Sequence, residues 1–252
     1  MTMIQEGLVG VFDILGYQNI IDNNEIEDVS KIVLEILTKL PSAAKDTLTR
    51  LISDEESRNF FIKEKENLKS LIISDTILLS LSVDPKALHG NKMSNWAIFL
   101  LHAAMLLRLA FDKGLPLRGS IDSGNFFILD NCFAGKPIVN AYRLANQLQF
   151  SGCALTPKVE KEFKNDLNRS QDAIRCLFFP YLLPLKNNEE MKLSLVNWLN
   201  PFDSWKEVPD DICQYVVKAF HAHNKDVSQK DIQKLINTEI IMRYSISKSW
   251  IV

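Results

Sequence analysis

Cysteine is scarce in this sequence of 252 residues, and the four cysteines that occur are far apart. They are Cys132, Cys153, Cys176 and Cys213. No two of them have the CxxC spacing typical of a zinc site, and no histidine follows one at CxxH spacing. Scattered thiols of this kind are typical of a protein kept reduced, so a cytoplasmic location is expected in place of a disulfide framework.

Membrane and export signals are also lacking. The N-terminus has no basic segment followed by a long apolar core, so we expect no signal peptide. The longest apolar run, 96–107, is interrupted by His102 and is followed at once by Arg108. Such a run is too short and too interrupted to cross a bilayer, and no stable membrane association is expected.

A strong charge of either sign is the third absence. The 29 lysines and arginines nearly balance the 31 aspartates and glutamates, and the formal net charge is −2. Without an overall basic field, we expect no binding to nucleic acid. A polyanionic ligand would have to be held by local groups, such as metal ions or a few placed arginines.

The apolar pattern predicts an α+β domain. Hydrophobic residues make up 46% and charged residues 24% of the chain, which is ordinary for a globular protein. Apolar periodicity predicts the order βα(α)ββαββα, followed by further strand near the middle of the chain. The expected elements are a strand at 7–15, a helix at 22–40 ending at Pro41, a second helix within 42–68, a hairpin at 71–81, a helix at 94–113, a hairpin at 116–129, a helix from Gly135 to about Phe150, a strand near Ala154 and a strand within 174–183.

The C-terminal part has a different pattern. Helical periodicity is present at 209–224 and 228–246, and no further strand is expected there. No low-complexity linker separates this part from the rest. We therefore predict a main domain over 1–186 and a helical elaboration, 187–252, packed on the same domain.

Two aspartates occupy unusual positions. Asp13 lies within a strand that is otherwise apolar, and Asp75 lies at the expected tip of the 71–81 hairpin. A carboxylate in a buried strand is costly unless it is paired, hydrogen-bonded or bound to a cation. Taken singly, Asp13 is most simply a helix cap and Asp75 a turn residue. Taken together, they suggest a site with two carboxylates for a divalent cation.

Four segments, in order over roughly 8–156, resemble the motifs of class III nucleotidyl cyclases. FDILGY at 12–17 resembles F-x-D-I/V-x-G-F, and ISD at 73–75 resembles the second aspartate motif, normally Gly-Asp. LRGSIDSG at 117–124 resembles R-x-G-I-x-x-G, and GKPIVNAYRLA at 135–145 resembles G-x-x-V-N-x-A-x-R-L. The resemblance implies a ferredoxin-like βαββαβ cyclase core with additional helices, and hence a catalytic domain over 1–186.

The resemblance also implies the chemistry. In the family, the ribose 3′-hydroxyl of a nucleoside triphosphate attacks its own α-phosphorus and releases pyrophosphate. Two Mg²⁺ or Mn²⁺ ions, about 3.5–4 Å apart, promote such displacements. Their implied ligands are the carboxylates of Asp13 and Asp75 and the backbone carbonyl of Ile14, which are the hard oxygen donors that these ions prefer.

Other groups are implied for the triphosphate. The backbone amides of Leu15, Gly16 and Tyr17, at the start of a helix, would cradle its phosphates. Arg118 is a candidate either for binding phosphate or for bracing its hairpin, and bracing is the reading we favour. Asp122 lies near the implied site, either supporting it or simply exposed.

Arg143 is implied as the catalytic arginine that stabilises charge at the α-phosphate. It falls on the family's arginine when positions are counted from Gly135 without a gap. The same count places Val139, and not Asn140, on the family's asparagine, which leaves the orientation of the ribose open. The alternative reading of Arg143 is an exposed helix arginine.

The positions that read the base in purine cyclases are here Leu71 and Cys132. The usual lysine and aspartate for adenine are absent, as is the pair used for guanine. The segment at 135–145 is most similar to the Pycsar pyrimidine cyclases of bacterial anti-phage defence. That similarity implies a soluble homodimer with composite sites, which makes cyclic UMP or cyclic CMP from UTP or CTP, with uridine favoured, as a second messenger.

Two alternatives stay open. One is a non-catalytic protein of cyclase fold that senses nucleotides or scaffolds a partner, which the valine at position 139 and the altered base positions favour. The other is a purine cyclase, acting on ATP, with an atypical base pocket. Retention of both aspartates and Arg143 favours an active enzyme.

Overall fold

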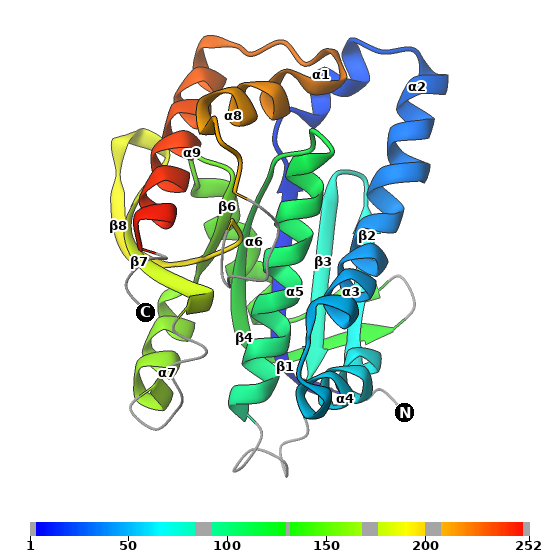
Figure 1. Cartoon of the computed structure of the whole chain (residues 1–252), viewed down its shortest axis with the longest axis vertical. Helices are drawn as coiled ribbons and strands as arrows, with labels where there is room; N and C mark the ends of the chain where they lie inside the picture. The colour runs from blue at the N-terminus through cyan, green and yellow to red at the C-terminus, as the bar shows by residue number, and fades with distance from the viewer. Residues whose placement is uncertain (1–3, 84–91, 130–131, 168–175, 200–207, 249–252) are drawn as a thin grey trace.

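The computed structural model describes residues 4–83, 92–129, 132–167, 176–199 and 208–248. Within these residues one eight-stranded sheet has the order β2-β3-β1-β4-β6-β8-β7, with β5 paired to β4 (Figure 1). Neighbouring strands are antiparallel except for β4 and β6, which are parallel. The strands are β1 (Gln5–Ile14), β2 (Leu68–Ile73), β3 (Thr76–Ser82), β4 (Leu117–Leu129), β5 (Cys132–Ala134), β6 (Gly152–Leu155), β7 (Phe178–Pro184) and β8 (Glu190–Val196).

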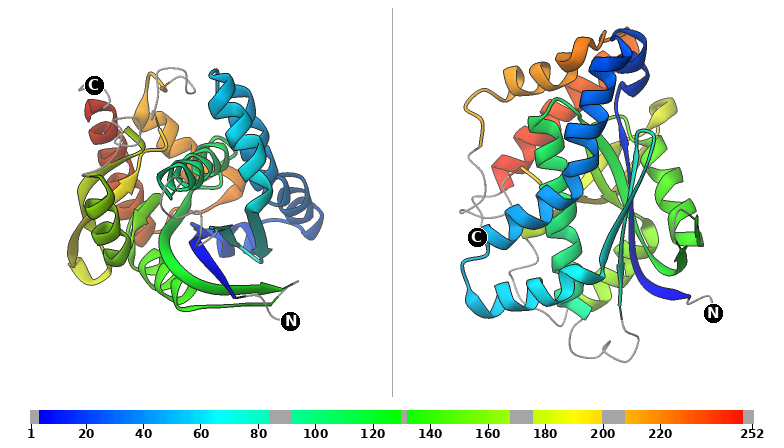
Figure 2. Two further views of the ribbon diagram at one scale, coloured as in Figure 1. Left: turned by 90° about the horizontal axis from the view of Figure 1, so that it is seen from below. Right: turned by 90° about the vertical axis from the view of Figure 1, so that its right-hand side faces the viewer.

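Helices cover both faces of the sheet, with α5 and α6 on opposite sides (Figure 2). This mixed arrangement confirms the α+β class expected from the sequence, with extra helices added to the core. The helices are α1 (Tyr17–Asp22), α2 (Ile26–Lys31), α3 (Leu40–Leu51), α4 (Glu55–Glu64), α5 (Lys92–Asp112), α6 (Lys136–Gln147), α7 (Pro157–Leu167), α8 (Ile212–His221) and α9 (Gln229–Lys248).

Strand β1 fixes the orientation of the site, because it lies between β3 and β4 and its side chains alternate between the two faces. Leu8 and Phe12 point into the main core with α5, while Val9 and Val11 pack in a smaller core with residues of α6. Alternation by two places Asp13 on the same face as Val9 and Val11. The aspartate therefore lies on the α6 side of the sheet, beyond the end of the apolar row.

Helix α5 is the central helix of the main core. The segment Asn95–Asp112 is long and apolar enough to cross a membrane by composition, but 78% of it is buried inside the protein. Burial of this kind identifies a core helix of the domain. His102 lies fully buried within it, and neither ring nitrogen has a hydrogen-bond partner among the described residues.

Two expected boundaries differ from the structure. The helix expected to end at Pro41 instead gives way, through a π turn (Ile32–Ile36) and a 3₁₀ turn (Leu37–Lys39), to α3. Pro41 lies in the first turn of α3, where its missing N–H costs no intrahelical bond. The hairpin expected at 116–129 is also wrong, because β4 runs unbroken through it and pairs with β5.

Strand β8 was not expected at all, since no strand was predicted after residue 187. It pairs with β7 on one side and touches β6 on the other, so the sheet continues into the C-terminal part. The two helices expected there are present as α8 and α9. The division of the chain at 186 stays a prediction.

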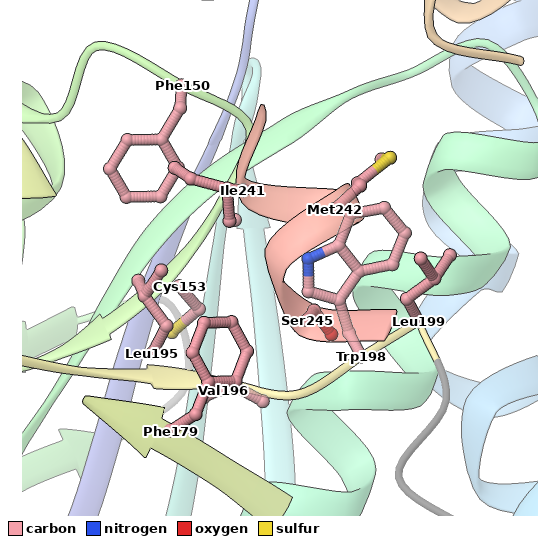
Figure 3. A pocket seen from close by; sticks show the side chains of 11 residues that line it. Phe150, Cys153, Phe179, Leu195, Val196, Trp198, Leu199, Ile241, Met242 and Ser245 are labelled. Carbon is pink, nitrogen blue, oxygen red and sulfur yellow. The ribbon is translucent and has the colours of Figure 1, made fainter. Parts of the chain in front are cut away.

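Helix α9 closes the end of the sheet that β6, β7 and β8 form. Figure 3 shows Ile241 and Met242 of α9 facing Phe150, Leu195 and Trp198. The space left between these side chains is only about 10 Å³, close to the minimum for a single water. This region is packed core, and it offers no room for a ligand.

Candidate functional site

Strand pairing brings the two predicted metal ligands together. Asp13 lies opposite Thr76 in the β1–β3 pair, and Asp75 precedes Thr76 in the turn between β2 and β3. The backbone N–H of Ile14 donates to the carbonyl oxygen of Asp75 at 3.2 Å. The hairpin tip expected for Asp75 is therefore present, and its carboxyl group lies within hydrogen-bonding reach of the Asp13 carboxyl.

The pKa of the Asp13 carboxyl shows what this proximity does. Burial and the neighbouring Asp75 carboxyl, against the lowering effect of the Arg118 guanidinium, together raise this pKa from 3.8 to about 6. Two carboxylates held side by side repel each other, and a bound cation would relieve that repulsion. The pair therefore fits a hard divalent cation that takes one or two carboxylates and completes its shell with water and phosphate.

In the part of the chain that the structure describes, no group of three or more His, Cys, Asp or Glu side chains is placed to hold a metal ion. A site whose protein ligands are three or four nitrogen and sulfur atoms is therefore absent from the described residues. The two-carboxylate arrangement is the kind that magnesium uses in nucleotide sites.

Arg118 is the immediate partner of Asp13. It lies opposite Asp13 in the β1–β4 pair, and its Nε and Nη2 atoms donate to Oδ2 of Asp13 at 2.9 and 2.7 Å. Nη2 also donates to Oδ1 of Asn146 on α6 at 3.0 Å. The guanidinium thus joins β4 to β1 and to α6, and it lies directly beside the Asp13 carboxylate.

The turn that follows β1 carries the predicted phosphate-binding amides. Gly16 has a φ of 77°, in the left-handed region that favours glycine, and it begins α1. The N–H of Leu15 donates to the carbonyl oxygen of Pro116 at 2.9 Å, so in this structure that amide is already engaged. The amides of Gly16 and Tyr17 carry the remaining prediction of a phosphate cradle.

Tyr17 lies against the hairpin tip. Burial, and then the nearby Asp75 carboxylate, raise the pKa of its phenol. Ser74, which precedes Asp75, has a φ of 55°. That left-handed conformation explains why the similar motif in nucleotidyl cyclases has glycine before its aspartate.

Arg143 is exposed on α6, and no described contact joins it to Asp13 or Asp75. It lines an open groove of about 420 Å³ between α6 and the start of α7. The groove residues are Asp122, Asn140, Arg143, Leu144, Gln147, Thr156, Pro157 and Lys158.

Asp122 forms the buried floor of this groove. Its carboxylate accepts hydrogen bonds from Nδ2 of Asn140 at 2.9 Å and from Oγ1 of Thr156 at 2.6 Å. The carboxylate is thus satisfied by neutral donors and does not face the pair of aspartates. The same contacts fix Asn140 toward β4, while Val139 is exposed on the helix surface.

The two predicted base-reading positions lie on different strands. Leu71, on β2, is half-buried against the small core on the α6 side of the sheet, and Phe133 packs against the same core. Cys132, next to Phe133 on β5, is exposed. Neither Leu71 nor Cys132 offers the charged group that reads a purine in the adenylyl and guanylyl cyclases.

Lys186 is a cation near the site that the sequence did not reveal. It lies in a 3₁₀ turn (Lys186–Asn188) between β7 and β8. Burial lowers its pKa, the Arg118 and Lys234 charges lower it further, and Asp13 raises it. These effects place the ammonium group within electrostatic reach of both Asp13 and Arg118. Recognition of the β7–β8 hairpin would have been the signal, because Lys186 lies in its polar tip.

Comparisons with known proteins show the fold. No protein-family model and no curated protein sequence matches the chain. A solved bacterial light-regulated adenylyl cyclase is similar in structure, with 13% identity and a TM-score of 0.50 over 88% of this chain and 59% of that chain. This chain therefore spans less than two thirds of that protein's length. The catalytic core of a rhodopsin-guanylyl cyclase with converted specificity, in complex with ATPαS, has 13% identity and a TM-score of 0.46 over 77% of this chain and 97% of that core. At such low identity the first likeness shows fold alone: the chain has the fold of a nucleotidyl cyclase.

Proposed function

We propose that this protein is a nucleotidyl cyclase that converts a nucleoside triphosphate, UTP or CTP, to its 3′,5′-cyclic monophosphate and pyrophosphate. The observation that carries the proposal is the placement of Asp13 and Asp75 within hydrogen-bonding reach, with Arg118 bonded to Asp13 and Lys186 within electrostatic reach of Asp13. Two carboxylates next to two cations suit a metal–triphosphate complex, since the metal takes the carboxylates and the phosphates take the cations. The cyclase fold and the order of the four sequence motifs support the same function.

Asp13, Asp75 and the carbonyl of Ile14 are proposed to hold two Mg²⁺ or Mn²⁺ ions. When bound, such ions neutralise the triphosphate and acidify the attacking hydroxyl. The chain's own part is to position the substrate. Arg118 bonds Asp13 in the free protein, and its guanidinium is proposed to meet a phosphate oxygen when substrate binds.

The reaction itself is a displacement at the α-phosphorus. The ribose 3′-oxygen forms a bond to that phosphorus, the bond from phosphorus to the α,β-bridging oxygen breaks, and the hydroxyl proton passes to solvent. Negative charge builds on the pyrophosphate that leaves. Lys186 and Arg118 stabilise that charge, and Arg143 stabilises the oxygens of the α-phosphate.

Arg143 is proposed to act on the site of a second subunit. No described contact joins it to the aspartates of its own chain, and a two-fold dimer would create two equivalent composite sites. The exposed apolar side chains of Val139 and Tyr142 lie on the same helix, with 46% and 53% of their surface exposed. An apolar surface around a catalytic arginine is what a homodimer interface would cover.

A pyrimidine substrate is proposed from the chemistry of the base positions. A purine edge is read by matched donors and acceptors, which the side chains of Leu71 and Cys132 do not provide. UTP is favoured over CTP, and a second-messenger role in anti-phage defence is proposed from the sequence resemblance alone.

The decisive experiment is incubation with each of the four nucleoside triphosphates and Mg²⁺ or Mn²⁺, followed by mass identification of products. We expect one cyclic nucleotide, from UTP, and its loss in Asp13→Ala and Asp75→Asn. Asp46→Ala, an exposed position on α3, is the matched control and should remain active. Four inert triphosphates with both metals and across pH would refute the proposal.

A second candidate is a non-catalytic nucleotide sensor. The observation that favours it is the engagement of Asn140 by Asp122, together with Val139 at the position that orients ribose in cyclases. A sensor would bind a triphosphate without releasing pyrophosphate, and its binding would be insensitive to Asp75→Asn. A purine cyclase would appear in the same assay as a cyclic product from ATP.

A further inference from the structure

Lys225, near the C-terminal end of the chain, is buried in an unexpected place. Only 5% of its surface is exposed, and its ammonium group donates to the carbonyl oxygens of Gly114 at 2.7 Å and Ala219 at 3.0 Å. Burial lowers its pKa to about 7, and no carboxylate faces it among the described residues. A buried cation that bonds only neutral carbonyls is costly, so packing alone does not explain a lysine here.

The stem of Lys225 lies against the turn that carries the predicted phosphate-binding amides. A Cβ added at Gly16 would lie 3.1 Å from Cδ of Lys225. The lysine therefore backs the left-handed residue from which α1 begins. On its other side, Gly114 leads to Pro116, whose carbonyl accepts the N–H of Leu15. Lys225 thus joins the two chain segments that flank this turn.

A set of asparagine contacts fastens the same C-terminal segment to the end of α1. Nδ2 of Asn23 donates to the carbonyl of Asn224 at 2.8 Å, and Nδ2 of Asn24 donates to the carbonyl of His223 at 2.9 Å. Nδ2 of Asn224 in turn donates to Oδ1 of Asn24 at 2.9 Å. We call these contacts, together with Lys225, the clasp. Figure 1 shows the result: α8 lies beside α1 at one end of the molecule.

The backbone of the clasp is itself strained. His223 and Asn224 have φ values of 58° and 55°, in the left-handed region that residues other than glycine adopt less often. Such conformations persist only where surrounding contacts determine them. Nε2 of His223 bonds the carbonyl oxygen of Lys113 at 2.7 Å and supplies one more such contact.

We propose that the clasp is a positioning device: residues 223–225 hold the 15–17 turn in the shape that receives the metal–triphosphate. The inference rests on the proposed function, and it assigns the C-terminal helices a part in substrate binding. Lys225 touches no substrate and acts through Gly16. If Lys225 had a purely structural role, its replacement would lower the melting temperature without changing hydrogen exchange in the 15–17 turn or the affinity for a ligand bound there.

Lys225→Met tests the inference because it keeps the aliphatic stem and removes the ammonium group. Lys218→Met, on the exposed face of α8, is the matched control. The first readout is hydrogen exchange of the ligand-free protein, well below its melting temperature. We expect amides at 15–24 to exchange at least tenfold faster in Lys225→Met than in the control. Unchanged exchange there would overturn the inference.

The second readout is binding of a UTP analogue with a methylene group in place of the α,β-bridging oxygen, in the presence of Mn²⁺. We expect Kd to rise about tenfold in Lys225→Met, and KM for UTP to rise more than kcat falls. Equal Kd values for the wild type and Lys225→Met would overturn the inference. A wild type that binds no triphosphate would instead overturn the proposed function, and the exchange readout would still report on the turn.

Asn24→Ala provides a second test if Lys225→Met fails to fold. It removes the bonds from Asn24 to His223 and Asn224, together with its bond to the carbonyl oxygen of Ile20, and leaves Lys225 in place. We expect the same direction of change in exchange and Kd, about threefold in size. Asn67→Ala, an exposed asparagine that bonds Glu64, is its control and should behave as wild type. Equal exchange at 15–24 in both variants would contradict the role of the clasp.

Discussion

The guanidinium of Arg118 donates both of its bonds to Asp13 to one carboxylate oxygen, Oδ2. The other oxygen, Oδ1, accepts no bond from Arg118 and is left for a cation or for the Asp75 carboxyl. Arg118 therefore keeps Asp13 oriented without closing the site. The arginine also links this orientation to α6 through Asn146.

Replacing Arg118 should lower both the stability of the protein and its affinity for the triphosphate. Arg118→Met leaves the Asp13 carboxylate half-buried without its hydrogen-bonded partner, and loss of a charged hydrogen bond costs about 1.5–3 kcal/mol. We expect a fall of that size in the free energy of urea unfolding, and a rise in KM for the triphosphate. Arg243→Met, which breaks an exposed pair with Glu239, should change stability by less than about 0.5 kcal/mol. Equal stability of the two variants would contradict a structural role for Arg118.

The pair of aspartates should be a source of instability in the metal-free protein. Asp75→Asn removes one of two neighbouring negative charges, so we expect a higher melting temperature than wild type in EDTA. Added Mn²⁺ should raise the melting temperature of wild type, because the ion binds only the folded state, and should have little effect on the variant. A wild type that is indifferent to Mn²⁺ and Mg²⁺ would speak against a metal site here.

Acid should destabilise the protein through His102. Burial, and then the Lys45 charge, lower the pKa of this histidine from 6.5 to about 3. The unfolded chain therefore binds a proton that the folded chain does not, and this contribution to stability is lost as pH falls below 6.5. At about 1.4 kcal/mol per pH unit, the loss approaches 2 kcal/mol by pH 5. Urea unfolding at pH 7 and pH 5 measures it, and His102→Leu should show the smaller difference.

Replacing the buried Asp122 carboxylate with an amide should destabilise the protein. Asp122→Asn presents an N–H₂ group to Asn140 or Thr156, both of which now donate to the carboxylate. An unmatched buried polar group costs about 1–3 kcal/mol, and we expect a loss of that size in thermal or urea unfolding. Asn140→Ala alone should cost less, because Thr156 still satisfies the carboxylate. A neutral Asp122→Asn variant would show that the network contributes no stability.

Much of the site's frame could be predicted from the sequence. Strand β1 and the β2–β3 hairpin are mostly apolar, and Asp13 and the Ser74–Asp75 pair interrupt their apolar runs. A local pattern of this kind depends only on residues close in sequence, so the strand or turn that it predicts does not depend on distant contacts. The position of Asp75 at the hairpin tip follows directly from it.

What escaped prediction depends on distant pairing or on mixed patterning. The Asp13–Arg118 contact joins residues 105 positions apart, and only the register of β1 with β4 creates it. Strand β4 contains Gly119 and Gly124 among small polar residues, which imitates a turn. Strand β8 begins with exposed, charged residues and becomes buried only from Leu193 onward, so its first half resembles a loop.

The unbroken length of β4 bears on how two subunits would contribute residues to one catalytic centre. From Arg118 to Leu129, next to Cys132, the curved strand (Figure 2) runs for roughly 36 Å at about 3.3 Å per residue, so Asp13 and Cys132 lie near its opposite ends. We expect a triphosphate anchored at Asp13 to have its base out of reach of Cys132 of the same chain. Under the proposed function, half of each catalytic centre belongs to each protomer. Two inactive variants, one lacking Asp13 and the other lacking Arg143, should regain activity when mixed, since one of the two centres in a heterodimer then contains only intact halves.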